Sequence, residues 1–361
     1  MKKYEIAVVP GDGIGKEVVP AALRVLDAVA AKFGIGFTFR DFDWSCETYK
    51  ATGRMMPEDG LARLRDHDAI FFGAVGFPGV PDHISLWGLL IPIRRGFDQY
   101  VNLRPVRLLP GITPAVRDRQ TGDIDFWVVR ENTEGEYSVL GGRFGEGTDS
   151  EMVIQTSVFT RRGTDRIIRY AFELAQRLGK DHVTSATKSN GIYHSMPYWD
   201  ERFHAVAGEY PHIRVDQYHI DILSARFVMS PERFDVVVAS NLFGDILSDL
   251  GPGVTGTIGV APSANIDPER RYPSLFEAVH GSAPDIAGQG IANPIGQIWA
   301  ASMMLDHLGE VEAGAAVLHA IESVLSSDAA PLTPDLGGKA TTADLSGAIA
   351  AALYTDARSK K

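Results

Sequence analysis

The sequence lacks the features of disulfide-stabilised, membrane-spanning and secreted proteins. Its 361 residues include one cysteine, Cys46, so no disulfide can form within the chain, and we expect a protein of the reducing cytoplasm. No apolar run reaches the roughly 18 residues of a membrane helix, because Gly and Pro interrupt the longest candidates, 71–80 and 258–264. Glu5 and the turn at 10–12 interrupt the N-terminal segment where a signal peptide needs an apolar stretch.

Basic residues are fewer than acidic ones. The 35 Lys and Arg residues face 46 Asp and Glu residues, which leaves a net charge of −11 and excludes the basic footprint of a nucleic-acid binder. The sequence also lacks a Walker loop, a Gly-x-Ser-x-Gly elbow and an HExxH zinc motif. What it does have is a 45% hydrophobic content and a length typical of two domains. The surplus of acids suggests that some of them hold a cation.

Apolar runs of two kinds alternate along the chain. Runs typical of strands occur at 5–9, 37–39, 69–72, 126–129, 183–187, 213–218 and 234–239. Helical periods lie between them, and later helices are expected from Pro294, as the first helical residue, to Gly309, and over 310–326. The alternation predicts an α/β fold with helices packed around a largely parallel sheet.

One segment breaks this rhythm. Residues 136–140 and 152–159, with Gly141-Gly142 after the first run, predict a long β-hairpin. Such a hairpin is either a surface ribbon or an arm that pairs with a second chain, because its strand edges are exposed.

The glycine turn at Gly11-Asp-Gly-Ile-Gly15 joins a strand to a helix. A dinucleotide fingerprint needs the pattern G-x-G-x-x-G, and Lys16 stands where the last glycine belongs. We therefore interpret this turn as structural.

Asp245 and Asp249 form a more informative pair. They lie four residues apart after the strand-like run 234–239, so a helix would place both carboxylates on one face. Ile246, Leu247 and Leu250 suggest that this face is partly buried, and Mg²⁺ or Mn²⁺ would compensate the two charges. The alternatives are acids favoured by a helix N-terminus or a solvated face.

Basic and phenolic side chains supply the other candidates. Arg94, Arg104 and Arg130 lie near segment ends, and guanidinium groups bind carboxylates through two hydrogen bonds. Lys188 directly follows the run 183–187, at the kind of strand end where open α/β sheets bind ligands. Lys188 is thus a candidate base, and Tyr137 is a weaker candidate by composition.

Five motifs in one order resemble a known family. They are Gly11-Asp-Gly-Ile-Gly15, Asn102-Leu-Arg-Pro105, Arg130-Glu-Asn-Thr-Glu134, Asn241-Leu-Phe-Gly-Asp-Ile-Leu-Ser-Asp249 and His280-Gly-Ser-Ala-Pro-Asp-Ile286. Together they resemble the metal-dependent β-hydroxyacid oxidative decarboxylases, which include isopropylmalate, isocitrate, homoisocitrate, tartrate and D-malate dehydrogenases. The resemblance implies a two-domain α/β fold that is not a Rossmann fold, with 1–103 plus 256–361 as the large domain and 104–255 as the small one. It also implies a homodimer joined through the small domains, with the hairpin at about 136–159 as an interlocking arm.

The resemblance also implies a role for each matching residue. Asp221, from the partner subunit, would join Asp245 and Asp249 at Mg²⁺ or Mn²⁺. Arg94, Arg104 and Arg130 would bind substrate carboxylates, and Tyr137 and Lys188 would form the acid/base pair, with Lys188 reaching across the dimer. The residues that match the dinucleotide site are Asn190, Glu277, His280, Gly281, Ser282, Ala283, Asp285, Ile286 and Asn293. Family members often need a monovalent cation such as K⁺ as well, and the sequence does not locate its site.

The implied cofactor is NAD. Asp285 and Ile286 match positions at the adenosine ribose, where a carboxylate accepts hydrogen bonds from the ribose hydroxyls and repels a 2′-phosphate. The implied reaction oxidises C2 of a hydroxy acid and releases its β-carboxylate as CO₂.

The segment 82–94 is the part that would distinguish substrates. Isopropylmalate enzymes have a glutamate where Trp87 stands here, and the Ser-x-Asn pattern of isocitrate enzymes is absent. A bulky Trp87 at the substrate favours a small C4 acid, and 82–87 and 97–102 also resemble the tartrate and D-malate dehydrogenases. We therefore expect oxidation of D-malate, to pyruvate and CO₂, or of tartrate. The alternatives are an isopropylmalate dehydrogenase and an inactive regulatory subunit, which would be expected to lack some of these acid/base and metal residues. Trp87 could also pack away from the site.

Overall fold

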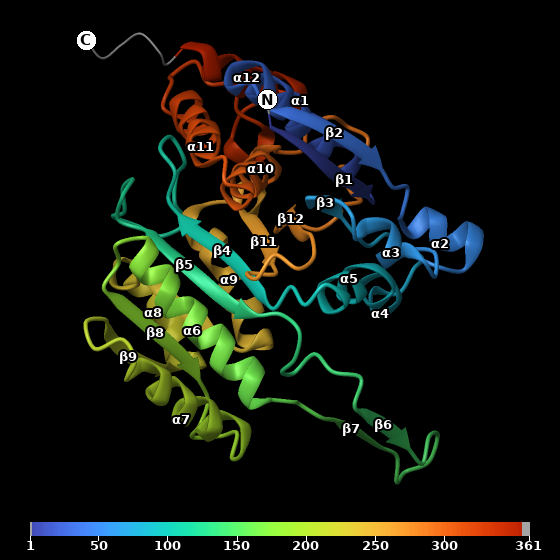
Figure 1. Cartoon of the computed structure of the whole chain (residues 1–361), viewed down its shortest axis with the longest axis vertical. Coiled ribbons are helices and arrows are strands. Elements are labelled where there is room, and N and C mark those ends of the chain that lie inside the picture. Colours follow the sequence, from blue (N-terminus) through green and yellow to red (C-terminus); the bar gives the residue numbers. More distant parts are fainter. Residues whose placement is uncertain (1, 356–361) are drawn as a thin grey trace.

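A ten-stranded mixed sheet runs through the molecule (Figure 1), described for residues 2–355 by a computed structural model. Its order is β2-β1-β3-β12-β11-β4-β5-β10-β8-β9. In chain order the strands are β1 (Lys3–Gly11), β2 (Gly36–Asp41), β3 (Ala69–Ala74), β4 (Val101–Arg107), β5 (Asp125–Glu131), β8 (His182–Thr187), β9 (Arg214–His219), β10 (Val236–Ala239), β11 (Pro262–Ile266) and β12 (Ser274–Ala278).

Helices cover this sheet and connect its strands. They are α1 (Gly15–Phe33), α2 (Cys46–Thr52), α3 (Gly60–Leu64), α4 (Asp82–Ser85), α5 (Ile91–Gly96), α6 (Arg161–Arg177), α7 (Ser195–Ala207), α8 (Ile220–Met229), α9 (Asn241–Thr255), α10 (Ile295–Leu308), α11 (Val311–Leu325) and α12 (Thr342–Thr355). Shorter helical turns are η1 (Leu86–Leu90, a π-helix), η2 (Pro231–Arg233), η3 (Ile258–Val260) and η4 (Pro334–Leu336). Among the described residues, no helix combines the length and the apolar character of a membrane span.

The α/β prediction is confirmed, and the parallel pairing holds at both sides of the sheet. At its centre, β12, β11, β4 and β5 pair antiparallel instead. The sequence did not predict β4, β11 or β12, because polar side chains interrupt their apolar pattern. Asn102, Arg104 and Asn265 lie on these strands and are buried.

The predicted helix ends are close to those observed. Gly309, at φ 85°, ends α10, as expected, because a left-handed residue there costs glycine little. The expectation that Pro294 is the first helical residue is wrong by one position, since Pro294 precedes the first residue of α10. The helix expected over 310–326 is α11.

The hairpin is present, but its first strand was predicted too early. It consists of β6 (Gly141–Phe144) and β7 (Met152–Gln155), paired antiparallel. The glycines at 141 and 142 therefore begin the first strand instead of following it. A Cβ at Gly141 would lie 2.0 Å from the carbonyl oxygen of Ile154, so the strand partner passes too close for any side chain there.

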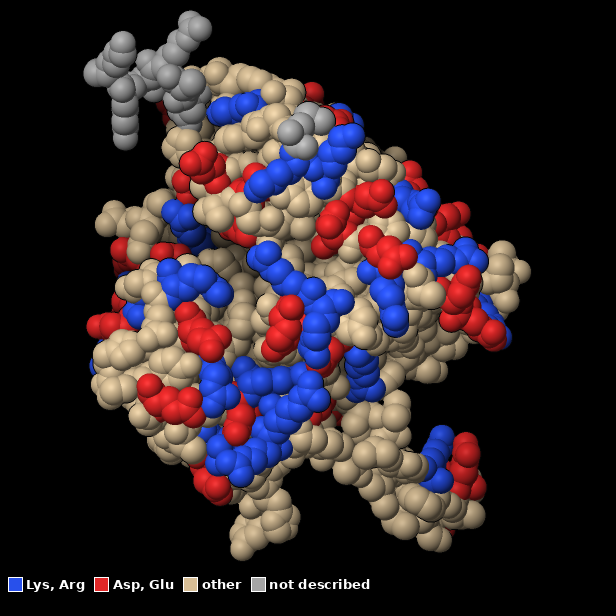
Figure 2. Space-filling model, viewed as in Figure 1, with Lys and Arg blue, Asp and Glu red and all other residues tan. Residues whose placement is uncertain are grey.

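The hairpin projects away from the rest of the chain (Figures 1 and 2). Within the hairpin, Arg143 forms ion pairs with Glu146 and Glu151. Its exposed apolar side chains are Val139, Leu140, Phe144, Met152, Val153 and Ile154. An exposed apolar ribbon of this kind is a surface that other chains can cover.

The two proposed domain boundaries can be compared with the positions of the strands and helices. The boundary at 103/104 falls within β4, and the one at 255/256 falls at the end of α9. The sheet continues across the first boundary, because β4 pairs with β5 on one side and with β11 on the other. The division into two domains stays a prediction.

Candidate active site

Many of the predicted site residues line one pocket of about 180 Å³. The pocket lies beside the ends of β3 and β12, with Gly73, Ala74 and Ala278 in its wall. The predicted residues that line it are Arg94, Arg104, Arg130, Tyr137, Asp245, Glu277, His280 and Gly281.

Asp245, on α9, is the centre of this group. One of its carboxylate oxygens accepts a hydrogen bond from Arg130, and the other accepts one of 2.6 Å from the hydroxyl of Tyr137. Burial opposes ionisation of Asp245, but Arg130 and Arg104 outweigh it and hold the pKa of this carboxyl below its usual range. Burial also raises the pKa of Tyr137 to about 12, with Asp245 adding to the shift, so the phenol keeps its proton at neutral pH.

Arg130 reaches Asp245 because α9 passes close to β5. Its guanidinium donates a hydrogen bond of 2.7 Å to the amide oxygen of Asn241, one turn before Asp245. A Cβ at Gly244 would lie 2.5 Å from Cγ of Arg130. Gly244 thus leaves the space through which Arg130 crosses the helix.

Arg104 holds the second aspartate of the pair. Its guanidinium donates to Asp249 at 2.9 Å and to the hydroxyl of Ser248 at 2.7 Å. Burial raises the pKa of Asp249, and Arg104 works against that rise. The prediction that Asp245 and Asp249 share one face of a helix is confirmed, since both lie on α9 and both pair with buried arginines.

Arg94 enters the pocket from α5. It forms an ion pair of 3.0 Å with Glu277, and both side chains are buried. Glu277 also accepts a hydrogen bond of 2.7 Å from Asn265, which in turn accepts one of 2.9 Å from Asn102. Asn265 was not predicted from the sequence. The available signal was polar side chains in strand-like segments, since buried polar groups need such partners.

The loop expected to bind a dinucleotide is tied to α1. The carboxylate of Glu17 accepts hydrogen bonds of 2.6 and 2.8 Å from the amides of Gly288 and Gly290. Asn293 donates to Asp335 at 2.9 Å. Neither Glu17 nor Asp335 was predicted.

The remaining loop residues differ in exposure. His280 and Ser282 are buried, and Nε2 of His280 has no hydrogen-bond partner among the described residues. Gly281 and Asp285 are exposed, and Ala283 and Ile286 are half-buried. A loop with an orphaned buried nitrogen and an exposed carboxylate has polar groups available for a ligand.

The glycine turn at 11–15 packs against this loop. The amide of Ile14 donates to the carbonyl of Ser282 at 2.8 Å, and the amide of Asp12 donates to that of Ala74 at 2.8 Å. A Cβ at Gly13 would lie 2.0 Å from the carbonyl oxygen of Ser282. These contacts agree with the structural interpretation, because the turn's glycines permit close packing of backbone on backbone.

Lys188, Asn190 and Asp221 do not line the pocket. Lys188, after β8, forms an ion pair of 2.9 Å with Asp221, at the start of α8. Its hydrogen bond lowers the pKa of Asp221, which is exposed to solvent. Within residues 2–355, no three His, Cys, Asp or Glu side chains form a group that could hold a metal ion. Asp221 is thus apart from Asp245 and Asp249 in one chain.

Trp87 does not line the arginine pocket either. It lies on an adjacent hollow of about 390 Å³, whose wall also includes Tyr137 and Glu136. Leu86 and Leu90, from the same segment, line the arginine pocket instead. Neither leucine was singled out from the sequence, and the role of Trp87 at the substrate stays a prediction.

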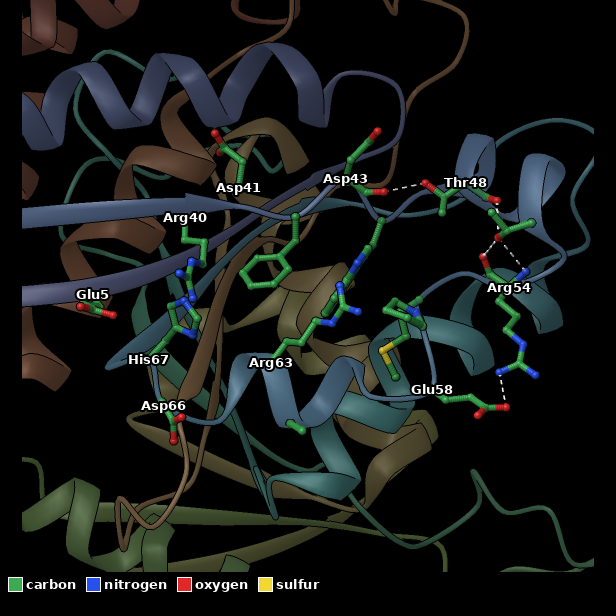
Figure 3. A pocket seen from close by; sticks show the side chains of 16 residues that line it. Glu5, Arg40, Asp41, Asp43, Thr48, Arg54, Glu58, Arg63, Asp66 and His67 are labelled. Carbon is green, nitrogen blue, oxygen red and sulfur yellow. Dashed lines mark hydrogen bonds and ion pairs between the residues drawn. The ribbon is translucent and has the colours of Figure 1, made fainter.

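A larger hollow, of about 1060 Å³, lies elsewhere (Figure 3). None of the predicted site residues lines it. Its wall mixes acids and bases, and Arg54 is already paired with Glu58. This mixture does not select a ligand of either charge.

Comparison with known proteins identifies relatives along nearly the whole chain. Residues 5–349 match the sequence pattern of the isocitrate/isopropylmalate dehydrogenase family. D-malate dehydrogenase (decarboxylating) from Escherichia coli (strain K12) is 63% identical over 356 residues, which cover 97% of this chain and 98% of that protein. Tartrate dehydrogenase/decarboxylase from Pseudomonas putida is 59% identical over 358 residues, with coverage of 97% and 98%. The isocitrate dehydrogenase structure from Methylococcus capsulatus superposes with a TM-score of 0.87 at 36% identity, and the match covers 97% of this chain and 99% of that one.

Proposed function

The chain belongs to the isocitrate/isopropylmalate dehydrogenase family, and from this premise we propose that it is a decarboxylating dehydrogenase of D-malate or tartrate. D-malate would be oxidised at C2 and give pyruvate and CO₂. The full-length similarity to enzymes of these two names supports the substrate class. The observation that carries the proposal is the pocket in which three guanidinium groups meet Asp245 and Tyr137.

The pocket suits a small dicarboxylate. Arg94, Arg104 and Arg130 are almost fully buried, so a bound carboxylate would face them with little water between. Burial lowers the pKa of Arg94 and of Arg104, which means that the pocket already carries the cost of dehydrating positive charge. A substrate with two carboxylates would offset that cost.

The donor set fits a hard divalent cation, Mg²⁺ or Mn²⁺. Asp245 and Asp249 offer carboxylate oxygens from one face of α9, which is the chemistry that such cations prefer. Asp221 is exposed on another element, so we propose that it joins them from the partner subunit.

The loop at 280–293 fits NAD. The orphaned Nε2 of His280 and the exposed carboxylate of Asp285 are available for polar groups of a dinucleotide. Asp285 would accept hydrogen bonds from ribose hydroxyls and would repel the 2′-phosphate of NADP. A kcat/KM with NADP⁺ equal to that with NAD⁺ would contradict this choice.

Each group of the chain has a separate task in the proposed reaction. When bound, the cation would supply Lewis acidity at the C2 oxygen and the nicotinamide would accept a hydride from C2. The three arginines hold the substrate carboxylates. Lys188 of the partner takes the proton of the C2 hydroxyl, directly or through water. Tyr137 returns a proton to C3 after CO₂ has left, and its high pKa keeps that proton available.

We further propose that the enzyme is a homodimer in the cytoplasm, with the β6–β7 arm in the interface. The arm's apolar side chains are exposed in one chain and would be covered by a second. Replacing Ile154 by Asp should weaken the dimer, and sedimentation at several protein concentrations measures it. A dimer as tight as the wild type would count against the arm.

A substrate comparison tests the proposed activity. The values of kcat/KM for D-malate, L-tartrate and 3-isopropylmalate are measured with NAD⁺ and Mn²⁺, and NADH and CO₂ are quantified in the same assay. D-malate or tartrate should exceed 3-isopropylmalate. A clear preference for 3-isopropylmalate would overturn the assignment, and no turnover of any of the three would favour a regulatory subunit.

A further inference from the structure

Two neighbouring arginines at the end of α5 point to different places. Arg94 is buried in the pocket beside Glu277. The side chain of Arg95 lies elsewhere, because successive residues on a helix are turned by about 100°. Neither the proposed reaction nor the family motifs give Arg95 a task.

Arg95 contacts two segments on either side of it. Its guanidinium donates a hydrogen bond to the backbone carbonyl of Tyr137. The same guanidinium lies 4.9 Å from the ring centre of Trp87, in the range of a cation–π contact. Arg95 is half-buried, so water competes only in part for these contacts.

The segment around Tyr137 is irregular and is held at several points by single contacts. Residues 132–140 form no regular helix or strand apart from a bridge at Gly135. Glu136 is anchored to the start of α9, through Ser240 at 2.8 Å and the amide of Leu242 at 3.0 Å. Tyr137 itself is held by its hydroxyl on Asp245 and by Arg95 on its carbonyl. The adjacent Ser138 is tied to the hairpin through the carbonyl of Thr156 and the side chain of Gln155. Arg95 is the side chain that holds the carbonyl of Tyr137 itself, so it helps to fix the backbone from which the phenol projects.

The π-helix η1 gives Trp87 its place in this arrangement. Its wider turn ends with the amide of Ile91 on the carbonyl of Leu86. Leu86 and Leu90 line the arginine pocket, whereas Trp87 lines the adjacent hollow that shares Tyr137 as a wall. Trp87 therefore contacts Arg95 and lines the same hollow as Tyr137, outside the arginine pocket.

We propose that Arg95 is a positioning residue that couples Trp87 to Tyr137 and thereby controls the second half of the reaction. This inference rests on the proposed function, in which Tyr137 protonates C3. Oxidation of D-malate transfers a hydride to NAD⁺ and releases the hydroxyl proton, giving oxaloacetate and NADH. Oxaloacetate then loses the C3–carboxylate bond as CO₂, and C3 takes one proton to give pyruvate. Loss of the tether would misplace the proton donor of that last step and leave the hydride transfer largely intact.

The test measures the two half-reactions separately in the metal-loaded enzyme. Arg95→Met should lower the rate of oxaloacetate decarboxylation at least about tenfold, because small displacements of a reacting group are costly. The KM for D-malate should change less than about twofold, since the three pocket arginines are untouched. The ratio of CO₂ to NADH formed from D-malate should therefore fall, and oxaloacetate should accumulate.

Further variants separate positioning from a general loss of structure. Arg95→Lys keeps a charged donor for the carbonyl of Tyr137 and should restore most of the CO₂ yield. Trp87→Phe should shift the ratio in the same direction as Arg95→Met, by a smaller amount. Adding Arg95→Met to Tyr137→Phe should cause little further loss, because both act on one proton transfer. Arg65→Met is the matched control, since Arg65 also lies over an aromatic ring, that of Tyr272 at 5.4 Å, and does not line the arginine pocket.

Three outcomes would contradict the proposed role of Arg95. Equal losses of NADH and CO₂ in Arg95→Met, or a CO₂ yield like that of Arg65→Met, would overturn the role of Arg95. If Arg95→Met does not fold, an unchanged CO₂ to NADH ratio in Trp87→Phe would overturn it. Failure of the wild type to oxidise D-malate and tartrate would instead contradict the proposed function.

Discussion

The residues assigned to one active site fall into two regions of different character. In the arginine pocket, Arg130 and Tyr137 both donate hydrogen bonds to Asp245, Arg130 lies 5.4 Å from the ring centre of Tyr137, and Arg130 is almost fully buried. The pair formed by Lys188 and Asp221 lies outside the pocket, with Asp221 mostly exposed. The fold of a single chain assembles the arginine pocket. The same fold leaves Lys188 and Asp221 outside that pocket.

The difference between the two regions shows which charged groups a single chain can hold in place. Buried charges must be paired, so the pocket's acids and arginines hold one another in place before any ligand binds. An exposed pair needs no such compensation and is free to serve another surface. The contrast fits a site completed by a second subunit, as we propose for Lys188 and Asp221.

The largest expected effect comes from the assembled region. Asp245→Asn should lower turnover at least about 1000-fold and remove its response to Mn²⁺ or Mg²⁺, because a bound cation supplies several kcal/mol of stabilisation. Initial rates of NADH formation over a metal titration measure this. Asp27→Asn, on an exposed part of α1, is the charge-matched control. A metal response like the wild type's in Asp245→Asn would remove this aspartate from the site.

Mixed dimers test whether the exposed region serves another chain. Lys188→Met and Asp245→Asn should each be inactive as homodimers. Co-expressed chains that pair at random should regain about a quarter of wild-type activity, because half of the dimers then carry one intact site out of two. No recovery in isolated mixed dimers would place Lys188 and Asp245 in the same subunit's site.

Stability should separate the two regions as well. Arg130→Met should lower the free energy of unfolding by about 2–3 kcal/mol, at the low end for a broken buried pair because Asp245 is 31% exposed. Lys188→Met should leave the midpoint of thermal unfolding nearly unchanged, since exposed pairs contribute little. Urea and thermal unfolding in metal-free buffer compare the two variants, and equal destabilisation would erase the distinction.

A smaller effect is expected from His307, a half-buried side chain. Burial, aided by Arg270, lowers the pKa of His307 to about 4. The unfolded chain binds this proton from about pH 6.5, so His307 makes the free energy of unfolding fall as pH drops from 6.5 to 4. His307→Leu should reduce that fall by about 2 kcal/mol.

The control is the same substitution at an exposed histidine, His212→Leu. Unfolding by urea at pH 4.5 and pH 7 measures both variants. A pH dependence in His307→Leu as steep as in the wild type would show that His307 is not the group responsible.

Local sequence patterns predicted much of the fold, and the reason for the exceptions is physical. The outer strands and the long helices carry regular apolar periods, so their positions follow from the residues themselves. The central strands β4, β11 and β12 were missed because Asn102, Asn265 and Glu277 are buried as a hydrogen-bonded network. Polar residues that satisfy one another inside a sheet look like surface residues in a sequence.

The candidate site shows the same limit. The glycine turn, the aspartate pair and the arginines were recognisable by type and spacing. Glu17, which holds the 288–290 loop, was not, because a glutamate in the first turn of a helix is common there for its effect on the helix dipole. Arg95 was overlooked because only its contacts with Trp87 and Tyr137 distinguish it from any arginine at a helix end.

The sequence alone shows which chemical groups this protein has and which neighbours along a helix share a face, as Asp245 and Asp249 do. Which distant groups come into contact depends on how the whole chain folds. Asp245 contacts Arg130 and Tyr137, which are 115 and 108 residues away in the chain. The π-turn at 86–90 likewise placed Leu86 and Leu90 in the pocket and Trp87 beside it. Helical spacing is a local property of the backbone, whereas contacts across strands depend on the order in which the sheet is assembled.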